Sequence, residues 1–297
     1  MAAAHNTVVR GARTADRVTP LDPGRMLQLT LAVIWLLDGM LQFQPFMFGQ
    51  GFPRMLAGTA RDNPAALARP VTWSAGFIAH HLTVCNALFA AFEVALGLGI
   101  ALRRTVRVAL ACSVAWSLGV WWLGEGLGRT FTGTASPLNG APGAVILYAL
   151  LAVVLWPSSR ASARVLWLAL WASMASFALL PASRAPGAAS GTFSAMAAGQ
   201  PGWLSWLDSR IAGVLTGDGL LTSVLLAAAL AAVAVSTFLP VRFARAGVVL
   251  AVAVAAFIWL AEGLGGIFTG SSTDPNSGPL LALVAIAFWP GQAGKSA

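Results

Sequence analysis

Charge is scarce in this sequence. Only 9% of its 297 residues are Asp, Glu, Lys or Arg, whereas 58% are hydrophobic. A soluble globular domain carries roughly 25% charged residues, so the composition excludes an ordinary soluble domain. The hydrophobic residues occur in long runs, as in helices that cross a bilayer. We therefore expect an all-α, multi-pass membrane helix bundle embedded in lipid.

Cysteine is also nearly absent. Cys85 and Cys112 are the only two cysteines, and both lie inside apolar segments. The sequence therefore has no disulfide framework and no CxxC motif, and cysteine usage indicates no redox compartment. Nothing in the spacing supports a Cys85–Cys112 disulfide.

Positive charge exceeds negative charge, with a formal net charge of +8. The arginines nevertheless form no basic stripe with interleaved aromatics, so we exclude a nucleic-acid partner. Most of them lie in the N-terminal segment and in short connectors between apolar runs, such as RRTVR, PSSRASAR and VRFAR. Because cytoplasmic loops are enriched in Lys and Arg, we place these segments in the cytoplasm. The bias toward Ala, Gly and Arg, with a single lysine, predicts a bacterial inner membrane.

Eight segments have the length and apolarity of membrane spans, for which about 20 mostly apolar residues are needed. They are residues 27–48, 74–101, 105–126, 142–157, 165–182, 218–238, 243–265 and 279–291, of which the fourth and eighth are short. Eight spans would leave both termini in the cytoplasm. Residues 1–26 are polar and basic, and we expect them to form a disordered cytoplasmic tail.

The chain repeats the motif ExGLGxxFTG. Its glutamates, Glu125 and Glu262, are 137 positions apart, and Pro142 and Pro279 match at the same offset. We therefore predict two parallel four-helix units in tandem, related by a pseudo-twofold axis along the membrane normal. The first unit covers residues 27–160 and the second covers residues 161–297. Short amphipathic helices are expected in the outer segments, at residues 53–70 and 201–215.

Glu125 and Glu262 each follow the apolar run of a third helix and precede glycines. A carboxylate at a helix C-terminus faces the negative end of the helix dipole, so each should have a compensating partner. One interpretation is a structural latch that orders the outer loop in both units. The alternative is a joint ligand site where the two acids meet at the pseudo-twofold axis.

The two halves differ in their ionisable residues. Such groups are costly inside a membrane and usually functional. The first half has Asp38, His80, His81 and Glu93, whereas the aligned residues of the second half are Met174, Gly213, Val214 and Leu226. Because the shared fold does not require this polar set, we predict that the first half carries the chemistry and that the second is scaffold.

His81 and Cys85 are spaced i,i+4, which would place them on one helical face. Such a pair could ligate copper or zinc, and a single histidine could ligate haem iron. The alternatives are a histidine hydrogen-bonded to a neighbouring helix, or a proton or quinone site that combines His with Asp or Glu. Gln42 and Gln44 are candidate polar neighbours of such a site.

Residues 27–126 resemble the DoxX-like family, which includes the DoxD-type subunits of quinone-linked thiosulfate oxidation. The matching features are LAVIWLLDGMLQF, an amphipathic outer stretch, and FEVALGLGIALRRTVRVALA. The chain departs from the family in being a tandem fusion, in having Gln42 and Gln44 after the helix-1 glycine, and in lacking vicinal thiols.

The resemblance implies a membrane subunit associated with quinone-linked respiratory electron transfer. In this hypothesis Asp38, His80, His81 and Glu93 are catalytic, while Trp35, Gln42 and Gln44 contact the quinone. One alternative is a transporter or metal-handling protein for a small ion or solute. Another is an assembly subunit that docks a protein partner through outer loops 49–73, 127–141, 183–217 and 266–278.

Overall fold

The computed structural model describes residues 22–156 and 160–290, and within these ranges every regular element is helical. Most of the tail predicted at residues 1–26 lies outside the described residues. Residues 23–26, however, already belong to the first helix. That helix begins at Pro23, and the Asp22 side chain caps it by accepting a hydrogen bond from the Arg25 N–H.

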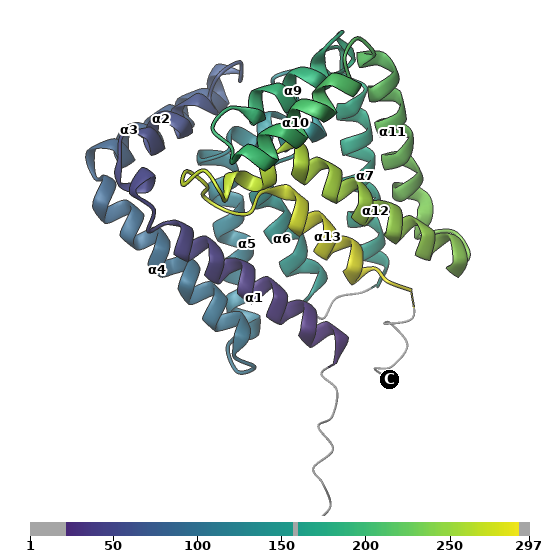
Figure 1. The fold of residues 1–297 in the computed structure, drawn as a ribbon. Helices are drawn as coiled ribbons and strands as arrows, with labels where there is room; N and C mark the ends of the chain where they lie inside the picture. The colour runs from purple at the N-terminus through teal and green to yellow at the C-terminus, as the bar shows by residue number, and fades with distance from the viewer. Residues whose placement is uncertain (1–21, 157–159, 291–297) are drawn as a thin grey trace, which may run out of the picture.

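Thirteen α-helices follow one another in the described residues (Figure 1). They are α1 (Pro23–Leu41), α2 (Gly51–Gly58), α3 (Ala65–His80), α4 (Leu82–Ala101), α5 (Val106–Leu123), α6 (Ala144–Val154), α7 (Arg160–Ala178), α8 (Pro181–Arg184), α9 (Ala188–Ala197), α10 (Gly202–Val214), α11 (Gly219–Ser236), α12 (Val241–Ala261) and α13 (Ser277–Ala287). Short 3-10 turns lie between some of them: η1 (Pro45–Phe48), η2 (Gly126–Arg129), η3 (Pro137–Asn139) and η4 (Gly263–Gly266).

Five of the described helices, α1, α4, α5, α11 and α12, are long and apolar enough to cross a membrane. This is the pattern expected of a multi-pass membrane protein. Three further apolar helices are shorter: α6, the Ser162–Ala178 part of α7, and α13. All eight lie where the apolar runs predict spans.

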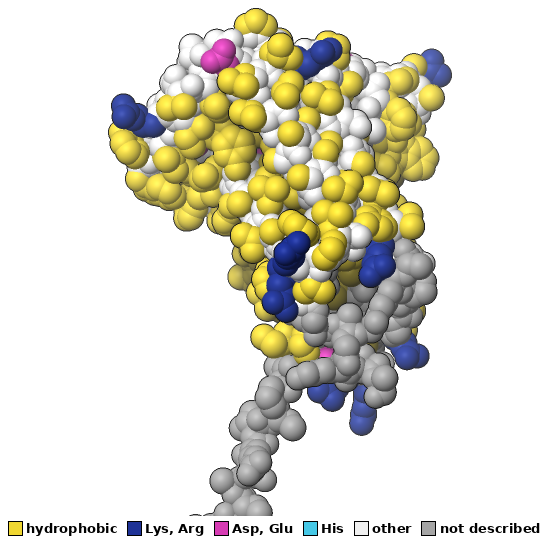
Figure 2. Space-filling model, turned by 90° about the vertical axis from the view of Figure 1, so that its right-hand side faces the viewer, with side chains coloured by type: hydrophobic (Ala, Val, Ile, Leu, Met, Phe, Trp, Pro, Cys, Tyr) yellow, Lys and Arg dark blue, Asp and Glu magenta, His cyan; other side chains and the backbone are white. Residues whose placement is uncertain are grey.

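The outer surface of the bundle agrees with a lipid environment. Hydrophobic side chains cover the middle of the face shown in Figure 2, and arginines gather toward its upper and lower ends. Large apolar side chains such as Val33, Met40 and Leu88 are exposed on the long helices. Such a surface is costly in water and favourable against lipid tails.

One expected span is wrong in outline. Residues 74–101 do not form a single helix, because the chain leaves helical geometry at His81, where α3 ends and α4 begins. The change of direction lets Ile78 and Cys85 pack in one cluster with Met47 and Phe52. The amphipathic helix expected at 53–70 is likewise replaced by α2 and the start of α3, whereas α10 fits the helix expected at 201–215.

Helices α1 and α4 pack closely against each other, as two glycines allow. A Cβ atom at Gly39 would lie 2.6 Å from Val94 Cγ2, and one at Gly97 would lie 2.9 Å from the Ala32 carbonyl oxygen. At the other end of the pair, the Arg25 guanidinium donates hydrogen bonds to the carbonyls of Ile100 and Ala101. This pairing fixes which residues of α1 face α4.

We expect Gly97→Ala to destabilise the protein by about 1–3 kcal/mol, because the added methyl group overpacks the α1–α4 contact. Thermal unfolding in detergent measures the change. Gly119→Ala is the matched control, since a Cβ on this α5 glycine meets no atom within 4 Å. Equal melting temperatures for the two variants would contradict the close contact.

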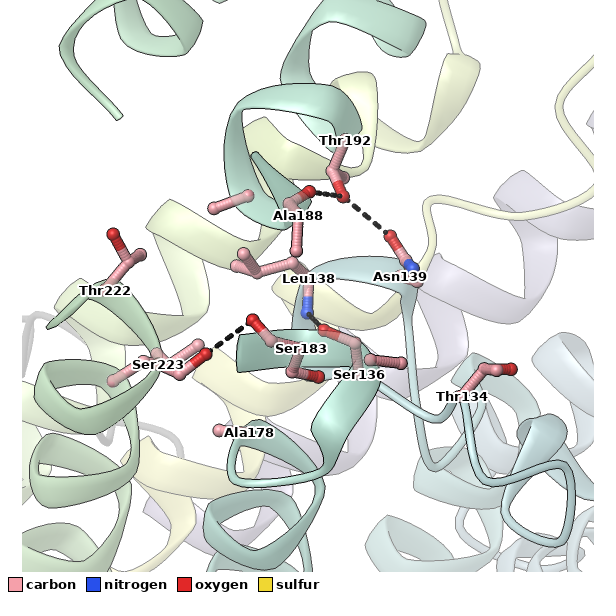
Figure 3. Close-up of a pocket in the computed structure, with 13 residues that line it drawn as sticks. Thr134, Ser136, Leu138, Asn139, Ala178, Ser183, Ala188, Thr192, Thr222 and Ser223 are labelled. Atoms are coloured by element: carbon pink, nitrogen blue, oxygen red, sulfur yellow. Dashed lines mark hydrogen bonds between the residues drawn. The ribbon is translucent and has the colours of Figure 1, made fainter. Parts of the chain in front are cut away.

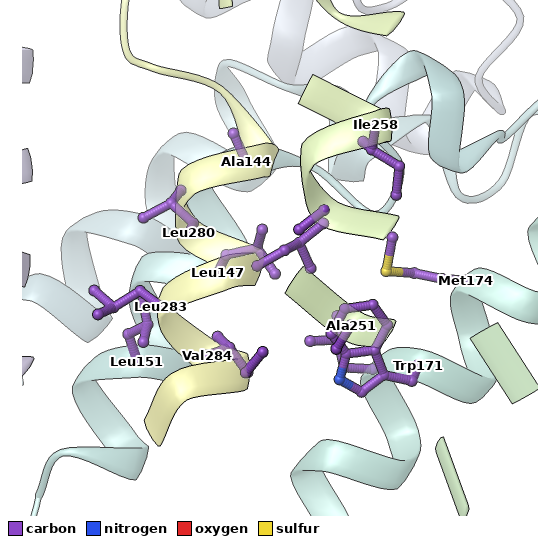
Figure 4. Packing of buried hydrophobic residues seen from close by; sticks show 14 of the residues in the cluster. Ala144, Leu147, Leu151, Trp171, Met174, Ala251, Ile258, Leu280, Leu283 and Val284 are labelled. Atoms are coloured by element: carbon purple, nitrogen blue, oxygen red, sulfur yellow. The ribbon is translucent and has the colours of Figure 1, made fainter. Parts of the chain in front are cut away.

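The centre of the bundle is formed by α6 and α13, which pack against each other. Figure 4 shows Leu147 and Leu151 of α6 near Leu280 and Val284 of α13, with Trp171 of α7 beside them. All five side chains are buried. The last helix of each predicted unit therefore lies at the junction of the two halves.

Corresponding elements recur along the chain at a nearly constant spacing. Five pairs of elements have first residues 137 positions apart: α1 and α7, α2 and α9, α3 and α10, α4 and α11, and η2 and η4. The spacing falls to 133 for α6 and α13, since Ala144 corresponds to Ser277. Pro142 therefore corresponds to Pro275, and its match to Pro279 in the sequence is wrong because the second loop is shorter.

Candidate functional site

Asp38 of α1 and Glu93 of α4 are both buried and lie within electrostatic range of each other. The close α1–α4 packing brings them together. Two amides belong to the same region: Gln42 is buried near Glu93, and the buried Asn86 side chain donates a hydrogen bond of 2.7 Å to the Gln42 carbonyl. The structure therefore assembles Asp38, Glu93 and Gln42, as the sequence predicts.

Tyr148 of α6 adds a hydroxyl to this region. Its ring lies 4.3 Å from the Trp35 ring, and its hydroxyl faces Asp38 without a partner that satisfies hydrogen-bond geometry. Trp35 is oriented by a hydrogen bond of 3.1 Å from its indole N–H to Ser113 Oγ. Trp35 therefore positions Tyr148. Tyr148, the only tyrosine in the chain, is not among the residues predicted from the sequence.

Asp274 comes from the other half of the chain, in the loop between η4 and α13. Its carboxylate accepts hydrogen bonds from the Asn276 N–H, at 2.6 Å, and from the Thr273 hydroxyl, at 2.9 Å. The loop is tied to the first half by Gln44, whose side-chain amide donates to the Ser272 carbonyl at 3.0 Å. Gln44 therefore contacts the loop rather than Asp38.

Asp274 is the common electrostatic neighbour of the other acids. It lies within electrostatic range of Asp38, Glu93, Glu125 and Glu262. We call these five residues the carboxylate cluster. Two of the five, Asp274 and Glu262, come from the second half, so the cluster draws on both halves of the chain. Sequence reasoning missed Asp274, since a loop acid is usually solvated.

Glu125 and Glu262 bind the N-termini of the central helices. Glu125 Oε1 accepts a hydrogen bond of 3.2 Å from the Val145 N–H at the start of α6. Glu262 Oε1 accepts a hydrogen bond from the Ser277 hydroxyl at the start of α13. A carboxylate at a helix N-terminus is favoured by the helix dipole. These are the contacts that the predicted latch requires.

Glycines in left-handed geometry allow each of these turns. Gly128 has φ +59° and Gly265 has φ +70°, and a Cβ on either would collide with the carbonyl of Pro142 or Pro275. The same two carbonyls accept indole hydrogen bonds of 2.7 Å from Trp121 and 2.8 Å from Trp259. The repeated motif is thus a compact turn that holds the glutamate against the next helix.

The environment of these loop carboxyls disfavours their charged forms. Burial is the main cause that raises the pKa of Glu125 and of Glu262 to about 8. The Asp274 charge adds to the rise for Glu125, whereas the hydrogen bond from the Ser277 hydroxyl partly opposes the rise for Glu262. Burial also raises the pKa of Asp274 above its ordinary value. Removing a carboxylate from water costs free energy unless an opposite charge replaces the water.

No such opposite charge reaches the cluster. In the described part of the chain the only salt bridge joins Arg129 to Asp62, at 3.4 Å on the surface. One oxygen on each of Asp38, Glu93, Glu125 and Glu262 has no hydrogen-bond partner. The arrangement can therefore hold protons.

The two histidines lie apart from the cluster. His80 and His81 are both exposed. The His80 Nδ1 atom lies 2.7 Å from the Gly76 carbonyl oxygen, and the His81 ring packs 4.8 Å from the Phe77 ring. The single pocket expected for these histidines with Asp38 and Glu93 is therefore not formed, because the break at His81 turns them to the surface.

The two members of the His81–Cys85 pair, which could ligate a metal, differ in burial. Cys85 is buried in the cluster with Met47 and Phe52, whereas His81 is exposed. Within the described ranges, no three His, Cys, Asp or Glu side chains are grouped as a metal site. Cys85 and Cys112 are both free thiols.

Comparisons with protein-family models, curated proteins and solved structures found no match to this chain. The resemblance of residues 27–126 to DoxX-like proteins therefore stays a prediction.

Proposed function

We propose that this chain is a multi-pass membrane protein of the transporter class that binds and exchanges protons at the carboxylate cluster. In this proposal eight helices cross a bacterial inner membrane as two parallel four-helix units, and both termini are cytoplasmic. The shorter helices α6 and α13 lie at the junction of the units, where protein rather than lipid surrounds much of their surface.

Two observations support this topology. Element starts recur at a spacing of 137 residues through most of the chain, as a tandem duplication of one unit produces. The α4–α5 connector carries Arg103 and Arg104, Arg107 follows in the first turn of α5, and this end lies near the start of α1, where Arg25 contacts Ala101. Arginines gathered at one end agree with a cytoplasmic face.

The observation that carries the proton-binding role is the absence of a counter-charge around the carboxylate cluster in the described residues. Structural ion pairs explain many buried acids, but none is present here. Ionisable groups in a membrane protein interior mark ion pathways and proton relays more often than packing. The pKa values of about 8 for Glu125 and Glu262 allow proton binding and release near neutral pH.

Quinone-linked redox function, with quinone as the cofactor, is the second candidate. Its specific support is the unpaired Tyr148 hydroxyl beside Asp38, since a hydroxyl can donate a hydrogen bond to a quinone carbonyl. In this form of the hypothesis His80 and His81 have no role. Copper or haem binding and docking of a protein partner through the outer loops stay predictions from the sequence.

The test is proton flux into vesicles that contain the purified full-length chain and an internal pH dye. With a potassium diffusion potential imposed, we expect a flux that Asp38→Asn reduces at least about ten-fold, because a neutral amide cannot relay a proton. Asp62→Asn is the matched control, since Asp62 is an exposed acid outside the cluster.

Three outcomes would contradict proton exchange. They are no flux above empty vesicles, equal loss in both variants, and flux that follows a sodium gradient instead of the proton gradient. Quinone extracted from the wild-type protein and lost in Tyr148→Phe would favour the redox role instead.

A further inference from the structure

A cavity of about 130 Å³ lies between the two halves (Figure 3). One wall is the loop before α6, which supplies Ser136 and Asn139. The opposite walls come from the second half: Ser183 of α8, Thr192 of α9, and Thr222 and Ser223 of α11. No charged residue lines it, so its chemistry differs from that of the carboxylate cluster.

Hydrogen bonds hold several of these side chains in place. The Thr192 hydroxyl lies within hydrogen-bond distance of two acceptors, Asn139 Oδ1 at 3.1 Å and the Ala188 carbonyl at 3.2 Å, and the first contact joins the two halves across the cavity. The Ser223 hydroxyl donates to the Ser183 carbonyl at 2.6 Å. Since each hydroxyl has used its one proton, the remaining lone pairs of Thr192 and Ser223 can accept hydrogen bonds.

Donors are present as well. The Asn139 amide nitrogen and the Thr222 hydroxyl make no hydrogen bond within the described residues, and the Ser136 hydroxyl acts only as an acceptor, from the Leu138 N–H. Arg129 reaches Thr134 at the cavity edge, but its charge is paired with Asp62. The cavity therefore offers neutral donors and acceptors, and no net charge.

We propose that this cavity binds a small neutral polyhydroxylated molecule. A cavity of about 150 Å³ holds a benzene molecule, which has six non-hydrogen atoms, so the space suits a solute of glycerol size. Alternating donors and acceptors match hydroxyl groups, which both donate and accept. A charged solute would lose its hydration here without gaining an opposite charge. This inference does not depend on proton exchange by the carboxylate cluster.

The test is saturation-transfer NMR with glycerol as the probe. The full-length chain is purified without glycerol and placed in phosphatidylcholine nanodiscs. For the wild-type protein we expect a signal that saturates as the glycerol concentration rises. In Thr192→Val the apparent affinity for glycerol should fall about five-fold, because one hydrogen-bonding group is lost. Ala182→Leu should abolish the signal, since this alanine lines the cavity. Ala185→Leu is the matched control, one turn away and outside the lining.

Circular dichroism and thermal melting verify that each variant is folded. A signal that does not saturate in the wild-type protein would overturn the proposal, and so would equal signals in all the variants. Because Thr192→Val is nearly isosteric, it keeps the test valid if Ala182→Leu disturbs the fold.

The polyhydroxylated group that binds in the cavity could belong to either of two sources, a free solute or the headgroup of a glycerol-bearing lipid. Exchanging phosphatidylcholine for phosphatidylglycerol separates them. Loss of the glycerol signal would assign the site to the headgroup, and an unchanged signal would assign it to a free solute.

Discussion

Raising the pH from about 5 to about 9 should lower the melting temperature of the detergent-solubilised protein by on the order of 10 °C. The reason is the raised pKa of Glu125 and Glu262, each about 8 in the folded protein against an ordinary value of 4.5. Between pH 4.5 and pH 8, both glutamates hold protons in the folded chain that they have released in the unfolded chain. The stability that they contribute is complete below pH 4.5 and is lost as the pH rises through 8.

The double variant Glu125→Gln, Glu262→Gln tests the assignment. Glutamine keeps a carbonyl oxygen that can accept from Val145 and Ser277, but it does not titrate. The melting temperature of this variant should therefore depend much less on pH. Asp62→Asn is the control, because Asp62 is an exposed surface acid. A wild-type protein equally stable at both pH values, or more stable at alkaline pH, would contradict the account.

The second large effect is expected for Asp274→Asn. This substitution removes a charge within electrostatic range of both glutamates, so their pKa values should fall. The same change should raise the melting temperature at pH 9, because a repulsion between like charges disappears. A substitution in a loop would then stabilise the protein only at alkaline pH.

Infrared titration of the carboxyl C=O stretch measures the first effect, and melting at pH 6 and pH 9 measures the second. Asp62→Asn is the matched control, since it removes an exposed acid outside the cluster. If Asp274→Asn leaves both the carboxyl titration and the alkaline melting temperature unchanged, Asp274 is not part of the cluster.

The fold was largely predictable where hydrophobicity alone determines it. The apolar runs became helical, all but residues 74–101 as single spans, and the Asp22-Pro23 pair that starts α1 is a recognisable N-terminal signal. The break at His81 was not predictable, because it depends on packing of Ile78 and Cys85 against a distant cluster. The correspondence of α6 to α13 was obscured by a loop that is shorter in the second half.

The site was predictable only in part. Asp38 and Glu93 stand out because an acid within an apolar run needs an explanation. The spacing of the hydrophobic residues could not show that His80 and His81 face outward, since nothing in the sequence indicates where the predicted span 74–101 breaks. Asp274 reaches the cluster through the folding of its loop onto Gln44, a tertiary contact between residues 228 positions apart.

The most direct test of the account is a count of the protons that the purified protein binds when the pH falls from about 9 to about 7. The account predicts that Glu125→Gln and Glu262→Gln each bind about one proton fewer than the wild-type protein, while Asp62→Asn binds the same number. Equal proton uptake by the wild-type protein and both glutamine variants would show that these carboxyls do not hold protons near neutral pH, and would contradict the central claim.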